Sequence, residues 1–438
     1  MSVKALLKRS NTRELPLPYT SSPLRLLLFD ILLVLRSIWS LPGILLPLTP
    51  WNSGELDELY PSWENIFEII VHAGLALCQV IFLLSLLGGF FFMMPALWIS
   101  IYTVSFIWVN RTICRLVFNR PEKILESQVS LKESPGLERE RWLYINGVAA
   151  GHHWLQSSLD RLALTFGRKV IGVHNPTDGL IFDIIESLIQ RNFTFATPDT
   201  RVGYAITKAT LLDPKYEKVI LILHSQGGIE GSLIIDWLLD ELPQQVLRKL
   251  EVYTFGNAAN HFNNPYKPLV GSEQPTMNGS KTLNQGTTLH AERSAFYIEH
   301  YANAMDFVCI WGVLEFASIP NRYMGRIFVR PGSGHQFNQH YLNTMFTFGP
   351  DRKVHDTNDF MESKVKFSAD EKMQPKHAGH LKDEVLVTSE RAPGQHSSTT
   401  DVQPIVETHN NQVTLRVKDL SRLWQYRNGG SPGGFRRQ

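Results

Sequence analysis

Residues 221–228, LILHSQGG, decide the fold that this sequence predicts. β-Favouring residues lead up to Ser225, and after Gln226 the run 229–242 repeats its apolar residues at helical spacing until Pro243. We therefore expect a buried strand, a sharp turn at the serine and then a helix. Such a turn projects the serine hydroxyl away from the backbone, as a nucleophile requires. A serine that only caps a helix after a core strand is the alternative interpretation.

Strands and helices alternate along the middle of the chain. The expected strands are 142–145, 169–173, 219–223, 250–255, 295–298 and 326–329, and the expected helices are 153–166, 178–191, 201–212 and 229–242. Alternation at these lengths predicts an α/β fold, with a mainly parallel sheet that helices cover on both faces. Right-handed crossovers place the loops that follow the strands on one edge of such a sheet, where ligands gather.

Composition and motifs exclude several classes of protein. The chain has 438 residues, enough for one large or two medium domains, and its formal net charge of +2 indicates no strongly basic or acidic partner. Its 3 cysteines are far apart, so neither a disulfide framework nor a zinc site is indicated. No dinucleotide, phosphate-loop or zinc-protease motif occurs. We expect no cofactor, no metal and no nucleic-acid partner, and the sequence identifies no protein partner.

Apolar residues accumulate in the region 24–110, after a basic arm at 1–23. We expect this region to associate with a membrane. Its first segment, 24–48, is interrupted by Arg25, Asp30 and Arg36, and either crosses the bilayer, lies in its interface or forms a bent re-entrant piece.

A second apolar segment follows, with no Asp, Glu, Lys or Arg from 69 to 110. This run is longer than the roughly 20 residues that cross a bilayer. We expect two membrane spans, at 69–87 and 90–109, joined by a hairpin at Gly88 and Gly89.

Basic residues flank the apolar region on both sides, in the N-terminal arm and at Arg111, Arg115, Arg120 and Lys123. The positive-inside rule places both flanks in the cytoplasm, which requires an even number of crossings. Either a surface-lying first segment with a hairpin of two spans, or one first crossing with one long tilted second helix, meets this requirement. The sequons at Asn110, Asn192 and Asn278 argue weakly for the opposite side. We expect an integral membrane protein with a cytoplasmic catalytic domain, in an organelle that the sequence does not identify.

Three further regions complete the expected organisation. Residues 111–141 form a charged connector, 142–348 the α/β domain, and 349–438 a polar tail whose composition predicts disorder. Within the domain, the loop-like stretch 260–289 forms a lid or a disordered insertion. Within the tail, 413–427 places Leu420, Leu423, Trp424 and basic residues on a helical wheel, so it either touches a membrane surface or forms only a transient helix.

A serine nucleophile needs a base, and the base needs an orienting acid. His335 follows the last expected strand in a glycine-bracketed loop and is the expected base, with His340 as the alternative. Asp306 is the only acidic residue in the loop after the preceding strand; it is the expected acid, although it also fits a helix cap. The chain order Ser, Asp, His is the order that an α/β-hydrolase sheet imposes.

An oxyanion hole needs backbone N–H groups beside the nucleophile. The amide of Gln226 directly follows the serine, and the second donor is expected in the loop after the strand 142–145. Gly147 there permits a close approach of the backbone, and Val148 follows it. A plain tight turn is the alternative role of this glycine.

Several short motifs resemble the α/β-hydrolase superfamily: YING at 144–147, HSQGG at 224–228, TFGNA at 254–258, DFV at 306–308 and GH at 334–335. They are most similar to fungal lipase or serine-esterase type proteins with an N-terminal membrane anchor, and the similarity covers about 142–348. The resemblance implies Ser225 as nucleophile, His335 as base, Asp306 as acid, and the amides of Gln226 and Val148 as the oxyanion hole. Leu223 stands where the family's G-x-S-x-G pattern has its first glycine, which puts catalytic efficiency in doubt.

Two functions fit the sequence. The first is a membrane-anchored serine hydrolase that cleaves a carboxylic ester of a lipid or lipid-like substrate through an acyl-serine, although a thioester or peptide would use the same residues. The second is a noncatalytic membrane adaptor that keeps the fold as a binding platform, which Leu223 and the long tail suggest.

Overall fold

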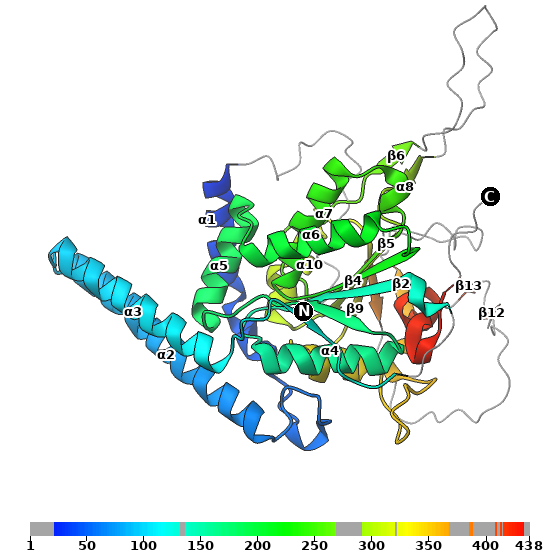
Figure 1. The fold of residues 1–438 in the computed structure, drawn as a ribbon, viewed down its shortest axis with the longest axis horizontal. Coiled ribbons are helices and arrows are strands. Elements are labelled where there is room, and N and C mark those ends of the chain that lie inside the picture. The colour runs from blue at the N-terminus through cyan, green and yellow to red at the C-terminus, as the bar shows by residue number, and fades with distance from the viewer. Residues whose placement is uncertain are drawn as a thin grey trace, which may run out of the picture.

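The computed structural model describes residues 22–131, 136–268, 291–319, 322–367, 385–388, 408–409, 412–413 and 415–432. These residues form an α/β fold around one large sheet, with a pair of long helices that projects away from it (Figure 1). Most of the predicted insertion at 260–289 lies outside the described residues.

The large sheet has nine strands in the order β1-β3-β2-β4-β5-β8-β9-β11-β10. The seven from β3 to β11 in that order are parallel, and β1 and β10 pair antiparallel at the two edges. The strands are β1 (Ile124–Glu126), β2 (Glu140–Ile145), β3 (Val170–Val173), β4 (Lys218–His224), β5 (Leu250–Phe255), β8 (Tyr297–Asn303), β9 (Arg326–Arg330), β10 (Val365–Phe367) and β11 (Val385–Thr388). Two small two-stranded sheets pair β6 (Tyr266–Pro268) with β7 (Ala291–Arg293) and β12 (Thr408–His409) with β13 (Gln412–Val413).

Helices cover both faces of the sheet. Figure 1 shows α6 and α7 on one side of it and α4 on the other. The helices of this body are α4 (His152–Phe166), α5 (Leu180–Phe193), α6 (Pro198–Leu212), α7 (Gly227–Glu241), α8 (Gln244–Leu247), α9 (Phe307–Trp311), α10 (Val313–Phe316), α11 (Asn343–Met345), α12 (Asp359–Glu362) and α13 (Val417–Leu420). The α/β class and the mainly parallel sheet predicted from the alternating pattern are confirmed.

Strand β4 lies inside the sheet, and its residues pair on one side with β2 and on the other with β5. Residues 219–223 are completely buried, as a strand covered on both faces must be. The prediction for β8 is wrong in its bounds, because the strand begins at Tyr297 and continues to Asn303 instead of ending at 298.

The domain is wider than the predicted 142–348. Residues 111–141 are not only a connector, because they include the edge strand β1 and the first residues of β2. Past residue 349, β10 and β11 extend the other edge of the sheet.

The C-terminal segment 415–432 belongs to the core, so the prediction of a disordered tail is wrong there. Leu423, Trp424 and Tyr426 are buried, with Tyr426 edge-on against Trp142 of β2. The guanidinium of Arg422 pairs with Glu251 of β5 at 2.8 Å. The apolar side of this segment therefore faces protein and is not free to touch a membrane.

The first apolar segment wraps the body. Helix α1 (Pro23–Ser37) and the short helices η3 (Ile38–Ile44) and η4 (Pro50–Asn52) belong to residues 22–62, which we call the N-terminal cover. The carboxylate of Asp30 on α1 accepts a hydrogen bond of 2.7 Å from Nε of Arg191 on α5, and both side chains are buried. Because of this contact, α1 packs on α5 at the surface of the body.

The second apolar segment forms a helical hairpin of α2 (Trp63–Phe91) and α3 (Ala96–Val117). Among the described residues, α2 is the one helix long and apolar enough to cross a membrane. The hairpin turns at 92–95 and not at Gly88 and Gly89, because α2 continues through both glycines.

Candidate active site

Ser225 occupies a sharp turn between β4 and α7. Its φ of 57° lies in the left-handed region, where a non-glycine residue is strained. The turn is held by its own backbone, because the N–H of Ser225 donates to the carbonyl of Phe255 at 3.0 Å and its carbonyl accepts from the N–H of Gly228 at 3.0 Å. The strand, strained turn and helix that residues 221–228 predict are therefore present.

Leu223 finds its space opposite a glycine of the following helix. A Cβ on residue 231 would lie 2.1 Å from Cδ1 of Leu223, so Gly231 leaves the room that the leucine fills. Gly227 brings α7 close to β2, since a Cβ there would lie 2.5 Å from the carbonyl oxygen of Ile145. The departure from G-x-S-x-G is thus accommodated by a small residue eight positions later, without loss of the turn.

The structure brings Ser225, His335 and Asp306 together. Oγ of Ser225 lies 2.8 Å from Nε2 of His335, and Nδ1 of the same ring lies 2.7 Å from Oδ2 of Asp306. A carboxylate only accepts hydrogen bonds, so Nδ1 carries the proton and Nε2 is left to accept the serine proton. This is the geometry of a nucleophile, a base and an orienting acid.

Asp306 bonds to His335 and also caps a helix. Its Oδ1 accepts from the N–H of Val308 at 2.9 Å at the start of α9, while Oδ2 faces His335. The hydroxyl of Tyr341 donates to the same Oδ2 at 2.7 Å, and the thiol of Cys309 lies 3.4 Å from it. Burial raises the pKa of Tyr341 well above its ordinary value, so its hydroxyl stays a donor.

Sequence reasoning missed Tyr341, Cys309 and the function of Gly256. Gly256 has a φ of 56°. A Cβ at this position would lie 2.7 Å from Cε1 of His335, so the imidazole packs directly on the glycine backbone. Gly256 belongs to the motif TFGNA at 254–258, which could have indicated its role. No local signal marks Tyr341, because its contact with Asp306 depends on the path of the chain between them.

His340 does not reach the serine. Its Nδ1 accepts from the N–H of Gln336 at 3.0 Å and its Nε2 donates to the carbonyl of Pro47 at 3.1 Å, within the short π-helix Phe337–Leu342. Both ring nitrogens are therefore occupied, and His340 is a structural residue. His224 behaves in the same way: its ring donates to the carbonyl of His335 at 2.9 Å, and burial holds its pKa well below the ordinary value.

The predicted oxyanion loop approaches the serine closely. A Cβ on Gly147 would lie 2.3 Å from Cβ of Ser225, so only glycine fits at this position. Among the described residues, the amides of Gln226 and Val148 donate to no other group, which leaves both available to a negative oxygen. Val148 is half-buried in the loop after β2.

Asp183 on α5 holds this loop in place. Its Oδ2 accepts from the N–H of Ala149 at 2.9 Å and from the hydroxyl of Thr177 at 2.6 Å. Burial raises the pKa of Asp183 to about 6. The side chain of Asn146 adds a bond of 2.9 Å to the carbonyl of Asn175, so the loop is fixed from two sides before any substrate binds.

The N-terminal cover holds the loop that carries His335. The N–H groups of Gly334 and His335 donate to the carbonyls of Gly43 and Ile44 at 2.7 and 2.9 Å. The carboxylate of Glu58 accepts from the N–H of Asn338 at 2.8 Å and from that of Gln339 at 3.0 Å. The site is closed to solvent in this conformation, with exposed fractions of 2% for Ser225, 7% for His335 and 0% for Asp306.

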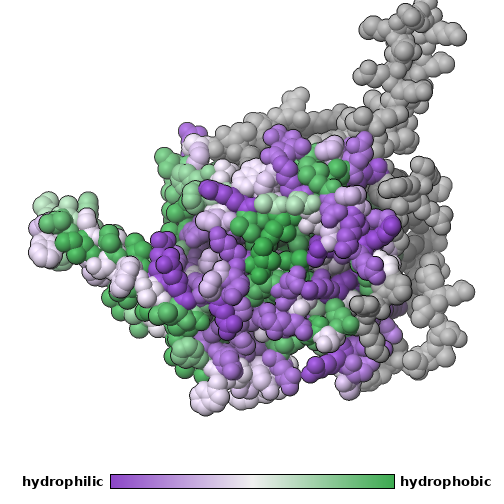
Figure 2. Space-filling model, viewed as in Figure 1, coloured by the Kyte–Doolittle hydropathy of each residue, from purple (hydrophilic) through white to green (hydrophobic). Residues whose placement is uncertain are grey.

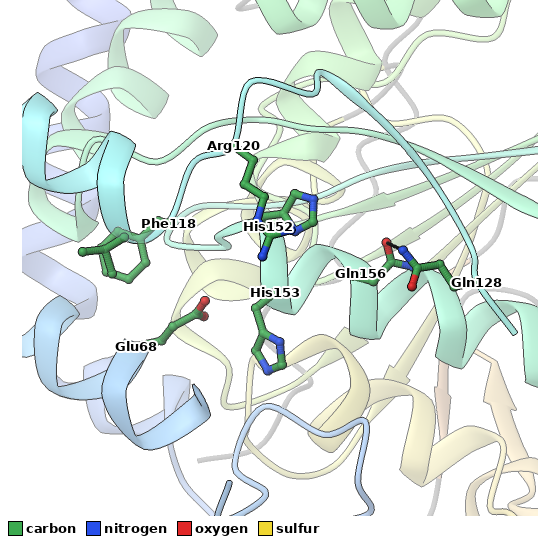
Figure 3. A pocket seen from close by; sticks show the side chains of 8 residues that line it. Glu68, Phe118, Arg120, Gln128, His152, His153 and Gln156 are labelled. Carbon is green, nitrogen blue, oxygen red and sulfur yellow. Dashed lines mark hydrogen bonds between the residues drawn. The ribbon is translucent and has the colours of Figure 1, made fainter. Parts of the chain in front are cut away.

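A cavity of about 230 Å³ lies between the base of the hairpin and α4, away from the triad (Figure 3). Its lining includes Glu68, Phe118, Arg120, His152 and His153, and no triad residue. Among the residues that the structure describes, no three His, Cys, Asp or Glu side chains are grouped so that they could hold a metal ion.

No family model matches the chain, and a search of curated proteins found no match. The arguments about function therefore depend on the geometry of this chain.

Proposed function

We propose that this chain is a serine hydrolase that cleaves a carboxylic ester of a lipid or lipid-like molecule through an acyl-serine. The observation that carries the proposal is the continuous chain of hydrogen bonds from Oγ of Ser225 through the His335 ring to Asp306, at 2.8 and 2.7 Å. A serine in a strained turn, next to two amides without a partner, adds to it.

The geometry assigns each step to a group. Oγ of Ser225 attacks the ester carbonyl while Nε2 of His335 accepts its proton, and the amides of Gln226 and Val148 donate to the oxygen that becomes negative. The tetrahedral intermediate then expels the alcohol, which takes the proton from Nε2. Water next attacks the acyl-serine with His335 as base, and the acid leaves as Oγ recovers its proton.

The apolar surfaces of the molecule support a lipid substrate. The cover places exposed Leu and Trp side chains on α1 and η3, and η3 leads directly to the backbone bonds with the loop of His335. An acyl chain that partitions into an apolar phase next to this surface would be close to the base.

Labelling with a fluorophosphonate probe tests the proposal, since the probe reacts only with an activated serine. We expect the parent protein to be labelled and Ser225→Ala to lose the label. Ser232→Ala is the matched control: Ser232 is buried in α7, the helix that follows Ser225, and its hydroxyl bonds to the carbonyl of Ile229 at 2.7 Å. This control should keep the label.

A noncatalytic adaptor is the second candidate, and the burial of Ser225 favours it. A folded parent that takes no label in detergent or in lipid vesicles would exclude the hydrolase and leave the adaptor. Labelling only in the presence of lipid would instead show that the closed site opens at a membrane.

A further inference from the structure

We propose that the α2–α3 hairpin enters one leaflet of a lipid bilayer without crossing it, and that the outer faces of α1 and α5 lie on the same membrane surface. This inference concerns the mode of membrane binding and does not depend on the proposed enzymatic activity. One shallow insertion of the hairpin would take the place of the two membrane spans that the sequence predicts.

The part of the hairpin that projects beyond the body is short. Gln79 of α2 is buried and bonds to Asn110 at 2.9 Å and to the carbonyl of Asp178 at 2.8 Å, so the hairpin is fixed to the body at this level. Phe82 and Phe106 both pack edge-on against Phe182 of α5, each with ring centroids 6.1 Å apart. The helix continues from Phe82 only to Phe91, about 14 Å at 1.5 Å per residue.

This length is about half of the roughly 30 Å hydrocarbon core of a bilayer. Deeper insertion would bring charges into the core, because Nε of Arg111 pairs with Asp178 at 3.1 Å beside the Gln79 contact and both side chains are partly exposed. The body therefore stops the hairpin after one leaflet.

The tip of the hairpin is entirely apolar. Residues 86–99 contain no charged side chain and no Ser, Thr, Asn or Gln, and the turn itself reads FMMP at 92–95. Met93 at the tip is 89% exposed. A hairpin that crossed the bilayer would place these side chains in water on the far side, whereas a hairpin that ends inside one leaflet keeps them in hydrocarbon.

The backbone N–H groups of the turn form hydrogen bonds within the hairpin. The N–H groups of Phe92, Met93 and Met94 donate to the carbonyls of Gly88, Phe90 and Gly89 at 2.9, 3.2 and 3.0 Å, and Pro95 has no N–H. Just below the tip, the hydroxyls of Ser85 and Tyr102 bond to each other at 2.9 Å. Donors that are satisfied within the hairpin can enter hydrocarbon, where an unpaired donor costs several kcal/mol.

Helix α1 supplies the surface-lying part. Five of its exposed apolar side chains fall on one face, at Leu24, Leu28, Ile31, Leu32 and Leu35, while Asp30 and Leu33 face the body and Phe29 packs against Phe316. Exposed Ile185, Ile189 and Phe193 on the neighbouring α5 extend this face toward the hairpin. Figure 2 shows hydrophobic surface along the side of the body from which the hairpin projects.

Basic side chains border the apolar face and favour lipid as its occupant over a second copy of the chain. Arg25 and Arg36 on α1 and Arg111 and Arg115 on α3 are exposed, in positions that suit anionic headgroups. A second copy of the chain would bring the same basic border to this face, whereas anionic headgroups supply the opposite charge.

Thiol accessibility in sealed vesicles tests the inference. The full chain with Cys78→Ala is the background, because Cys114 and Cys309 are buried. Single cysteines are added as Met93→Cys at the tip, Leu32→Cys on the outer face of α1 and Lys215→Cys on the exposed surface of the body. Each variant is reconstituted in phosphatidylcholine with a minor fraction of phosphatidylserine, and an impermeant maleimide is applied outside or trapped inside.

We expect Lys215→Cys to react from one compartment only, Met93→Cys to react from neither until detergent is added, and Leu32→Cys to react more slowly than Lys215→Cys. Reaction of Met93→Cys from the compartment opposite to Lys215→Cys would show a full crossing. Reaction of Met93→Cys from the same compartment as Lys215→Cys would show that the tip lies in water. Protection of Met93→Cys that persists in detergent would show that the tip packs against protein. Each of these three results overturns the inference and leaves the serine hydrolase proposal untouched, since labelling of Ser225 is measured separately.

Discussion

The elbow region, residues 218–241, and the N-terminal cover are built in opposite ways, although both contribute to one site. In the elbow region, strand, turn and helix follow one another directly, and Ser225 is placed by its neighbours in sequence. The cover reaches the site across long intervals, as Gly43 bonds to Gly334 and Glu58 to Asn338. Local patterns therefore position Ser225, whereas distant contacts position the loop of His335.

The two regions are also physically joined. Asp30 of α1 pairs with Arg191, whose Nη1 donates to the carbonyl of Ala258 at 2.6 Å, and the N–H of Ala258 donates to the carbonyl of Ser225 at 3.2 Å. A change in the cover is therefore expected to reach the elbow through buried contacts. Four substitutions test how the two regions contribute to turnover and to stability.

The largest effect is expected for Asp306→Asn, which lies outside both regions and contacts His335 beside the elbow. The amide cannot hold the proton of His335 on Nδ1 as a carboxylate does, so turnover of a p-nitrophenyl ester should fall by about 10⁴-fold. The thermal unfolding midpoint should change little, because the side chain keeps its size and its cap of α9. Unchanged turnover would remove Asp306 from the mechanism.

Asp30→Ala should be the most destabilising change in the cover. It leaves the Arg191 guanidinium buried without its counter-charge, which costs about 3–5 kcal/mol. Chemical unfolding in detergent measures the loss. The double variant Asp30→Leu with Arg191→Met removes both charges and should recover most of the stability; a single variant as stable as the parent would show that the ion pair does not hold α1 on the body.

Glu58→Gln tests the cover by pH. Burial raises the pKa of Glu58 from 4.5 to about 7, so between these values the folded state keeps a proton that the unfolded state has released. The parent should therefore lose stability as the pH rises from about 4.5 to about 7, by roughly 3 kcal/mol from this group. Unfolding free energies across this window should fall less steeply in Glu58→Gln; parallel curves would contradict the prediction.

Gly231→Ala gives the smallest expected effect and concerns the elbow alone. The new methyl group would meet Leu223, and overpacking of this kind costs about 1–3 kcal/mol. Adding Leu223→Ala should return part of the stability, because the two side chains compete for one space. A double variant whose loss equals the sum of the single losses would show that Gly231 does not compensate for Leu223.

Much of the site could be predicted because its signals are local. Hydrophobic runs of strand length, helical spacing after Ser225 and glycines beside His335 are each read within a few residues, and the order Ser, Asp, His follows from one sheet topology. The bounds of β8 were mistaken because its polar end, up to Asn303, is buried by neighbours that the sequence does not reveal. Burial of Trp424 and Tyr426 could not be read for the same reason, since Tyr426 contacts Trp142 of β2 and Glu251 of β5, and Trp424 stacks on Phe346.

The sequence by itself determined the α/β class, the sharp turn at Ser225 and the presence of a long apolar segment near the N-terminus. The tertiary structure decided that His335 and not His340 faces the serine, that Tyr341 donates to Asp306, that Gly231 makes room for Leu223 and that the hairpin is fixed to the body at Gln79. The physical reason is range: backbone preferences and periodicity act between near neighbours, while hydrogen-bond partners and packing space are set by residues that only folding brings together.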